Sequence, residues 1–149
     1  MLDHYDVNSA QIKFELTETA LLQHMEDAAR EMTLLQTSGI RFALDDFGTG
    51  YSSLSYLKQL PLVQLKMDKS FVMDVIDDPN DAAIARSIIG LGQNLGLSVI
   101  AEGVETEAVM SFLKQAECPE FQGFYLGRPM AADQFEQTYL GVPPPTPGR

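Results

Sequence analysis

The chain has 149 residues, a formal net charge of −11 and 45 % hydrophobic residues. This length fits one globular domain with a sizeable core. The acidity argues against nucleic acid polymers and anionic membranes as partners, because Lys and Arg bind both. With Cys118 as its single cysteine, the chain has no disulfide framework and fits a reducing cytoplasm. No stretch is apolar enough to cross a membrane, so we expect this segment to make no membrane contact, although a longer parent could be anchored.

Apolar runs and helical spacing predict strands that alternate with helices along the chain. The predicted strands are residues 12–16, 40–44, 62–67, 97–101 and 121–125. The predicted helices run from residue 17 or 19 to about 37, from 54 to 60, from 80 or 81 to 95, from 106 to 116, and from 131 to 140. Residues 141–149 hold four of the eight prolines, which predicts a disordered tail.

The alternation of five strands with helices predicts parallel strands in an α/β fold. Two architectures remain open at this point, an open doubly wound sheet and part of a (β/α)8 barrel. Five units are too few for a closed barrel of eight, since typical barrels need about 250 residues. If the chain is a barrel, it is therefore a partial one. The strand at residues 97–101 is predicted to be buried on both faces.

Each predicted strand carries a polar residue at or near its carboxyl end, which favours the barrel. These residues are Glu15, Asp45, Lys66, Glu102 and Gln122. In a parallel array the carboxyl ends of the strands lie on one face, where barrel enzymes build their active sites. We therefore expect the five side chains to meet at one mouth.

The carboxylates at this mouth suggest hard divalent cations. Glu15, Asp45, Asp46 and Glu102 supply oxygen ligands only, which suit Mg²⁺ or Mn²⁺ rather than zinc. Asp45 is placed to bridge two such ions, and ions about 4 Å apart can activate water against a phosphodiester. Lys66 has two interpretations, a catalytic positive charge or a structural salt bridge to Asp45 or Asp68.

The segment Gly48-Thr49-Gly50 is a weak signal for a phosphate-binding loop, because it lacks the lysine and helix spacing of known phosphate cradles. It is better interpreted as a mobile loop whose backbone N–H groups are held by a carboxylate such as Glu18.

Five motifs, in order and spacing, resemble the EAL domain family of bacterial phosphodiesterases that linearise cyclic di-GMP to pGpG. They are Glu15-Leu16-Thr17-Glu18-Thr19, Asp45 to Ser53, Lys66-Met67-Asp68, Ala101-Glu102-Gly103-Val104-Glu105, and Gln122-Gly123 followed by Pro129. The resemblance covers about residues 2–137. It implies a modified (β/α)8 barrel of which residues 1–140 are the last five βα units, with 141–149 as the tail.

The resemblance also implies roles for individual residues around two Mg²⁺ or Mn²⁺ ions. The implied metal ligands are Glu15, Asp45, Asp46 and Glu102, with Asp45 shared between the ions. Lys66 and Glu102 would be the catalytic residues, with Lys66 in contact with the hydrolytic water and Glu102 bound to the second metal or its waters. Gln122 would lie beside the substrate or beside a water outside the metal's own ligands, and Asp68 would lie beside the substrate. Glu18 would anchor the loop that contains Gly48, Thr49 and Gly50. The family further implies a homodimer in the bacterial cytoplasm.

The sequence departs from the family in one serious way. The Glu-Ala-Leu motif and a following asparagine, both ligands of the first metal, belong upstream of residue 1 and do not occur in this sequence. We therefore expect the 149-residue chain to show weak or no turnover. The alternative is a non-catalytic module that binds cyclic di-GMP or pairs an open sheet edge with another chain.

Overall fold

The structure is a computed structural model that describes residues 7–23, 25–48 and 57–141. At its centre lies a parallel sheet of five strands in the order β1-β2-β3-β4-β5. The strands are β1 Lys13–Thr17, β2 Arg41–Phe47, β3 Gln64–Met67, β4 Ser98–Ala101 and β5 Glu120–Phe121. Each strand pairs with the next one along the chain, as in the wall of a (β/α)8 barrel, whereas a doubly wound sheet reverses its order. The fold is therefore α/β with the topology of a partial barrel, as predicted.

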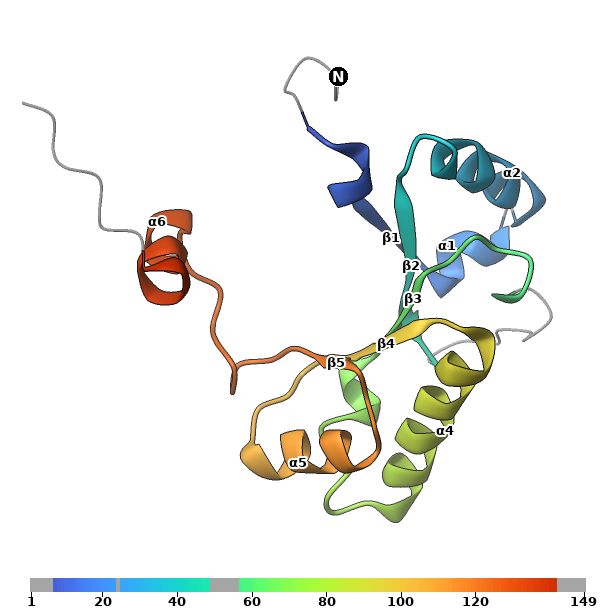
Figure 1. Cartoon of the computed structure of the whole chain (residues 1–149). Coiled ribbons are helices and arrows are strands. Elements are labelled where there is room, and N and C mark those ends of the chain that lie inside the picture. Colours follow the sequence, from blue (N-terminus) through green and yellow to red (C-terminus); the bar gives the residue numbers. More distant parts are fainter. Residues whose placement is uncertain (1–6, 24, 49–56, 142–149) are drawn as a thin grey trace, which may run out of the picture.

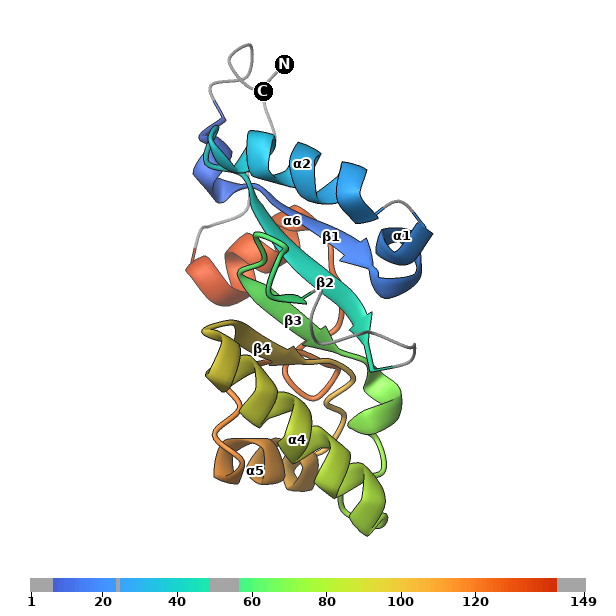
Figure 2. The ribbon, with the colours of Figure 1, turned by 90° about the vertical axis from the view of Figure 1, so that its right-hand side faces the viewer.

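Helices lie on both sides of this sheet. They are α1 Glu18–Gln23, α2 Met25–Gln36, α4 Pro79–Leu95, α5 Glu107–Gln115 and α6 Ala132–Phe135, with short helical turns η2 Ser9–Gln11, η3 Lys69–Phe71 and η4 Glu136–Leu140. Helices α1, α2 and α4 lie on one side of the strands, and α6 stands apart on the other side (Figures 1 and 2). Helices α4 and α5 are neighbours, and Arg86 of α4 stacks over the Phe112 ring of α5 at 4.6 Å.

The sequence at the two ends of helix α4 explains where the helix begins and ends. The Asp78 side chain accepts a hydrogen bond from the backbone N–H of Asn80 at 2.7 Å and caps the helix, and Pro79 occupies the first turn. Gly96 ends the helix in the left-handed conformation at φ 70°. The helix therefore begins one or two residues before the predicted start and ends where predicted.

The core lies between the helices and one face of the sheet. Its strand residues include Phe42, Leu44, Leu65, Met67 and Val99, and its helix residues include Leu21, Met32, Ile88, Ile89 and Leu113. Because alternate strand residues point to opposite faces, the residues between them, such as Glu15, Ala43 and Lys66, belong to the other face. The sheet therefore has an apolar outer face and an inner face rich in polar side chains.

Two helix predictions need correction or fall outside the description. The helix predicted up to about residue 37 is two helices, α1 and α2, on either side of residue 24. Residues 54–56 of the helix predicted at 54–60 lie outside the described residues, as do residues 142–149 of the predicted tail. The helix predicted at 131–140 is divided in the structure, where α6 covers Ala132–Phe135 and continues into the π-helical turn η4.

Two details of burial and the length of one strand also differ from the prediction. The helical spacing of the apolar residues in 80–95 predicts that Ile84 faces the core, but Ile84 is 38 % exposed because the adjacent Ala85 takes the buried position. Strand β4 is fully buried on one face only, since its residues alternate between buried and half-buried. Strand β5 has two residues instead of five, because the chain turns where the Leu126 N–H donates to the Gly123 carbonyl at 3.0 Å.

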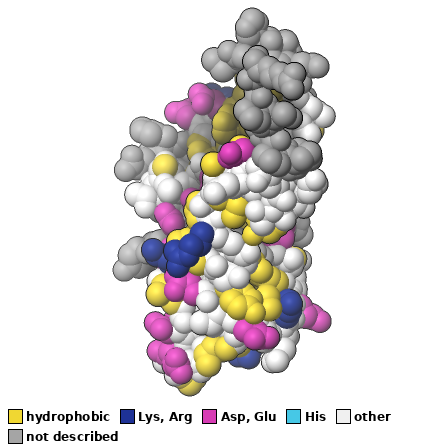
Figure 3. Space-filling model, turned by 90° about the vertical axis from the view of Figure 1, so that its left-hand side faces the viewer, with side chains coloured by type: hydrophobic (Ala, Val, Ile, Leu, Met, Phe, Trp, Pro, Cys, Tyr) yellow, Lys and Arg dark blue, Asp and Glu magenta, His cyan; other side chains and the backbone are white. Residues whose placement is uncertain are grey.

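Within the described ranges, no helix is both long and apolar enough to span a bilayer. The surface seen from the side of α6 carries scattered hydrophobic side chains among acidic ones and few basic ones (Figure 3). This distribution agrees with the negative net charge of −11.

Candidate active site

Three carboxylates surround the ammonium group of Lys66. Lys66 Nζ lies 2.6 Å from Glu15 Oε2, 2.9 Å from Asp45 Oδ1 and 2.9 Å from Glu102 Oε1. The four residues come from β1, β2, β3 and the residue directly after β4. The parallel strands therefore bring these predicted residues together at their carboxyl ends.

Strand register explains how side chains from β1 and β3 meet across β2. Glu15 is paired with Ala43 of β2, whose side chain is a single methyl group. On the same face of β3, Lys66 follows Gln64 by two residues and so points the same way. The small Ala43 leaves room for Glu15 and Lys66 to reach each other above β2.

The environment of Lys66 keeps it positively charged. The residue is 8 % exposed, and burial on its own would lower the pKa of the ammonium. The hydrogen bonds to its three carboxylate partners outweigh burial and raise the pKa of Lys66 above its ordinary range. Lys66 is therefore a permanent positive charge at neutral pH.

The adjacent acids Asp45 and Asp46 end β2 at an irregularity of the sheet. The pairing register between β2 and β3 shifts between Leu44 and Phe47, and Asp46 has a positive φ of 54°. The backbone N–H of Asp46 donates to Asp45 Oδ1 at 3.1 Å. Because a non-glycine residue rarely adopts this conformation, the backbone of β2 is locally distorted at this pair of acids.

Gln122 and Asp68 were both expected beside the substrate, and their side chains make different contacts. Gln122 Nε2 donates to Glu102 Oε1 at 2.9 Å, so it joins the Lys66 cluster through Glu102. Asp68 caps η3, where its side chain accepts a hydrogen bond from the Ser70 N–H at 3.0 Å and this bond lowers the pKa of the carboxyl. Among the described residues Lys66 forms no salt bridge with Asp68, so its ion pairs follow the Asp45 alternative and add Glu15 and Glu102.

The expected loop anchor is only partly described. Glu18 is 4 % exposed, and neither of its carboxylate oxygens has a hydrogen-bond partner among the residues that the structure describes. Gly48 has φ 103°, and a Cβ there would lie 2.9 Å from the Phe71 ring. Thr49 and Gly50 lie outside the described residues. The proposed contact between Glu18 and this loop therefore stays a prediction.

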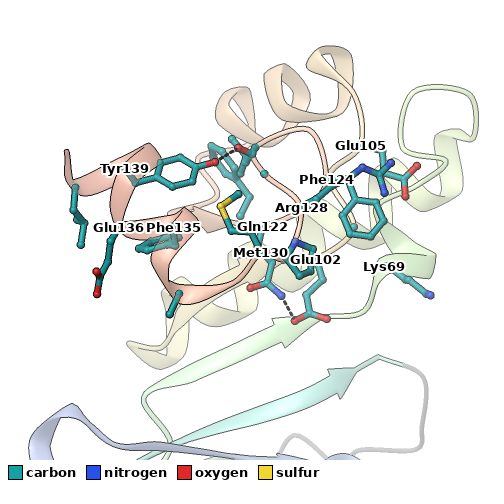
Figure 4. Close-up of a pocket in the computed structure, with 18 residues that line it drawn as sticks. Lys69, Glu102, Glu105, Gln122, Phe124, Arg128, Met130, Phe135, Glu136 and Tyr139 are labelled. Carbon is teal, nitrogen blue, oxygen red and sulfur yellow. Dashed lines mark hydrogen bonds between the residues drawn. The ribbon is translucent and has the colours of Figure 1, made fainter. Parts of the chain in front are cut away.

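A pocket of about 1020 Å³ adjoins Glu102 and Gln122 and extends toward α6 (Figure 4). Sequence reasoning did not select Phe124, Arg128 or Tyr139, which line it. The Arg128 guanidinium stacks over the Phe124 ring at 4.3 Å. The signal for Phe124 and Arg128 was the presence of two aromatic residues and one arginine between Gln122 and Pro129, which the strand prediction for 121–125 obscured. Tyr139 lies in the segment 131–140, which was predicted only as a helix.

The donor chemistry of the cluster fits a hard cation. No three His, Cys, Asp or Glu side chains of the described ranges converge as a metal site in this structure. Glu15, Asp45 and Glu102 converge instead on an ammonium group, which shows that the site accumulates negative charge around a cation. Carboxylate oxygens without His or Cys are the ligand set of Mg²⁺ and Mn²⁺.

The acidic, lysine-centred cluster lies at the carboxyl ends of the strands of a partial barrel, where barrel enzymes build their active sites. The family model of the EAL domain matches residues 1–129, and the chain belongs to this family. It is 42 % identical over 130 residues to the bifunctional diguanylate cyclase/cyclic di-GMP phosphodiesterase MucR of Pseudomonas aeruginosa, a match over 87 % of this chain and 19 % of MucR. Over 131 residues it is 41 % identical to the cyclic di-GMP phosphodiesterase NbdA of the same organism, which covers 86 % of this chain and 17 % of NbdA.

Solved structures of the family have the same fold. The MucR phosphodiesterase in complex with c-di-GMP superposes with a TM-score of 0.86 at 42 % identity, covering 90 % of this chain and 54 % of that chain. The manganese/cy-diGMP complex of Klebsiella pneumoniae BlrP1 superposes with a TM-score of 0.80 at 33 % identity, covering 86 % of this chain and 33 % of that chain. The chain thus spans about half of the MucR domain and a smaller part of its curated relatives.

Proposed function

We propose that the Lys66 cluster is part of a metal-dependent phosphodiesterase centre that acts on cyclic di-GMP. The observation that carries this proposal is the convergence of Glu15, Asp45 and Glu102 on Lys66 at the carboxyl ends of the strands. Its support from relatives is that MucR and NbdA are named as cyclic di-GMP phosphodiesterases. The manganese/cy-diGMP complex of BlrP1 supports a divalent cation and this substrate.

The residues of the chain would divide the work by their chemistry. Glu15, Asp45, Asp46 and Glu102 would hold Mg²⁺ or Mn²⁺, which supply Lewis acidity at the phosphodiester and lower the pKa of water. Lys66, kept protonated by its carboxylates, would stabilise the negative charge that develops on the phosphoryl oxygens. Gln122 holds the Glu102 carboxylate through the 2.9 Å hydrogen bond.

The 149-residue polypeptide by itself should turn over cyclic di-GMP slowly or not at all. Its sequence contains no Glu-Ala-Leu segment, and the family resemblance places ligands of the first metal there. Removal of metal ligands leaves fewer oxygen atoms to offset the loss of ion hydration, so the affinity for the first ion falls.

Manganese binding and product formation test the proposal. Mn²⁺ titration by calorimetry should detect binding to the wild-type chain, and Asp45→Asn and Glu102→Gln should each weaken it by about tenfold. Glu26→Gln, a change at an exposed position of α2, is the matched control and should bind like the wild type. Equal Mn²⁺ affinity in Asp45→Asn and the wild type would contradict the proposed centre.

The same samples distinguish hydrolysis from the second candidate function, which is binding of cyclic di-GMP without hydrolysis. Chromatography of cyclic di-GMP incubated with Mn²⁺ and the chain measures pGpG, and calorimetry measures binding. Binding with no pGpG supports the non-catalytic module, which the ion pairs of Lys66 with all three carboxylates also allow. We further propose that the chain forms a homodimer in the bacterial cytoplasm, which light scattering of the purified chain tests.

A further inference from the structure

The loops that follow β4 and β5 are joined by backbone hydrogen bonds around Val104. The Val104 N–H donates to the Gln122 carbonyl at 3.0 Å, and the Tyr125 N–H donates to the Val104 carbonyl at 3.0 Å. Val104 is fully buried. Because both backbone groups of Val104 are bound to the β5 loop, the two loops cannot move independently without breaking these bonds.

Gly123 makes this close approach possible. A Cβ at residue 123 would lie 2.1 Å from the Val104 carbonyl oxygen, 2.2 Å from its nitrogen and 2.6 Å from its carbonyl carbon. These atoms belong to the backbone, so no side-chain rotation could relieve the overlap. Any residue with a Cβ at position 123 must therefore push the β5 loop away from Val104.

A second glycine, Gly103, allows the segment 102–104 to pack closely against the residues that follow β3. Gly103 has φ 77°, and a Cβ there would lie 2.7 Å from Lys69 Cβ in the loop after β3. In addition, the Glu102 N–H donates to the Met67 carbonyl at 3.2 Å. The segment 102–104 is thus fixed between the loops of β3 and β5, and its first residue is the carboxylate that contacts Lys66.

We propose that Gly123 is a positioning residue that sets Glu102 and Gln122 side by side at the mouth of the barrel. It acts through the backbone of Val104, because a glycine has no side chain that could contact the cluster itself. Through this contact, Glu102 Oε1 lies 2.9 Å from both Gln122 Nε2 and Lys66 Nζ. The importance of Gly123 for catalysis rests on the proposed phosphodiesterase centre.

The test measures the geometry directly in the full chain. In isotope-labelled protein, NMR should show a nuclear Overhauser cross-peak between the Gln122 side-chain amide protons and the Glu102 methylene protons. The cross-peak should be lost in Gly123→Ala, because the added methyl separates the two loops. It should persist in Gly90→Ala, where a Cβ would meet nothing within 4 Å.

A third variant separates positioning from general destabilisation. Leu113→Ala removes a fully buried side chain of α5 and should lower the midpoint of thermal unfolding, yet keep the cross-peak. A cross-peak that persists in folded Gly123→Ala, or that is missing in the wild type, would overturn the proposal.

If Gly123→Ala does not fold, amide hydrogen exchange in the wild-type chain tests the proposal instead. The Val104 and Tyr125 amides should exchange at least about 100-fold more slowly than unbonded exposed amides, and equal rates would overturn the proposal. Neither measurement uses metal or cyclic di-GMP. Failure of the positioning role and failure of the phosphodiesterase centre are therefore seen in different experiments.

Discussion

Glu15 and Lys66 are 51 residues apart in the chain, yet Glu15 Oε2 lies 2.6 Å from Lys66 Nζ. Their strands, β1 and β3, are separated by β2, and the methyl side chain of Ala43 leaves the space above β2 open. The contact depends on the alignment of three consecutive parallel strands, in which Glu15 pairs with Ala43 and Ala43 pairs with Gln64, two residues before Lys66. It therefore ties the fold to the candidate active site, and replacement of the lysine should affect both.

Lys66→Met should destabilise the chain and make it more sensitive to added cations. The change leaves three carboxylates facing each other without the ammonium, so their mutual repulsion is no longer compensated. Loss of one partner of a buried ion pair costs about 3–5 kcal/mol, but the Glu15 side chain is 44 % exposed, so we expect about 2 kcal/mol. Urea unfolding with and without Mn²⁺ measures the effect.

Lys58→Met is the control for this prediction, because Lys58 is exposed and takes no part in the cluster. It should change the free energy of unfolding by less than about 0.5 kcal/mol. Mn²⁺ should raise the stability of Lys66→Met more than that of either other protein, since a divalent cation can replace the lost charge. The same stability for Lys66→Met and wild type would show that the ion pairs contribute nothing measurable.

Asp68 should make stability depend on pH in the acidic range. The hydrogen bond from the Ser70 N–H lowers the pKa of Asp68 below its ordinary 3.8 in the folded chain. Its contribution is therefore present above about pH 4 and is lost as the pH falls through the folded-state pKa. Asp68→Asn keeps an acceptor at this cap but cannot titrate. The free-energy difference between wild type and variant, from urea unfolding, should shrink between neutral pH and about pH 3. A difference that stays constant with pH would contradict this assignment.

The positions of the strands could be predicted because short apolar runs between turn signals leave few alternatives. The convergence of Glu15, Lys66 and Glu102 could be predicted too, since parallel strands end on one face of the sheet. The number of carboxylates that contact Lys66 could not be predicted, because it depends on the register shift after Leu44 and on the small side chain of Ala43. Both are properties of neighbouring strands rather than of the lysine motif.

Other differences arise where tertiary contacts override a local pattern. Residues 121–125 are apolar enough for a strand, but Gly123 packs on Val104 and the chain turns. Helix α4 has apolar residues around much of its surface, so spacing alone could not tell that Ala85 rather than Ile84 is buried.

Two glycines of α4 should respond oppositely to the same substitution. Gly92→Ala would place its Cβ 2.2 Å from Val99 Cγ2, so we expect a loss of about 1–3 kcal/mol from overpacking against β4. Gly90→Ala meets nothing within 4 Å and should gain about 0.5–1 kcal/mol from helix propensity. Thermal and urea unfolding of the pair give the comparison. If both variants are stabilised, the close contact between α4 and β4 is absent in solution.

Glu18→Gln should stabilise the chain when metal and substrate are absent. The Glu18 carboxylate is 4 % exposed, and its oxygens lack hydrogen-bond partners in the described part of the chain, so its negative charge is desolvated without compensation. The neutral amide has the same shape, and we expect a gain of about 1 kcal/mol in the free energy of unfolding. Urea unfolding measures it, with the exposed Glu26→Gln as the control that should stay within about 0.5 kcal/mol of wild type. A loss of stability in Glu18→Gln would instead show that the carboxylate is already bound, and the segment that contains Thr49 and Gly50 would be the first place to look for its partner.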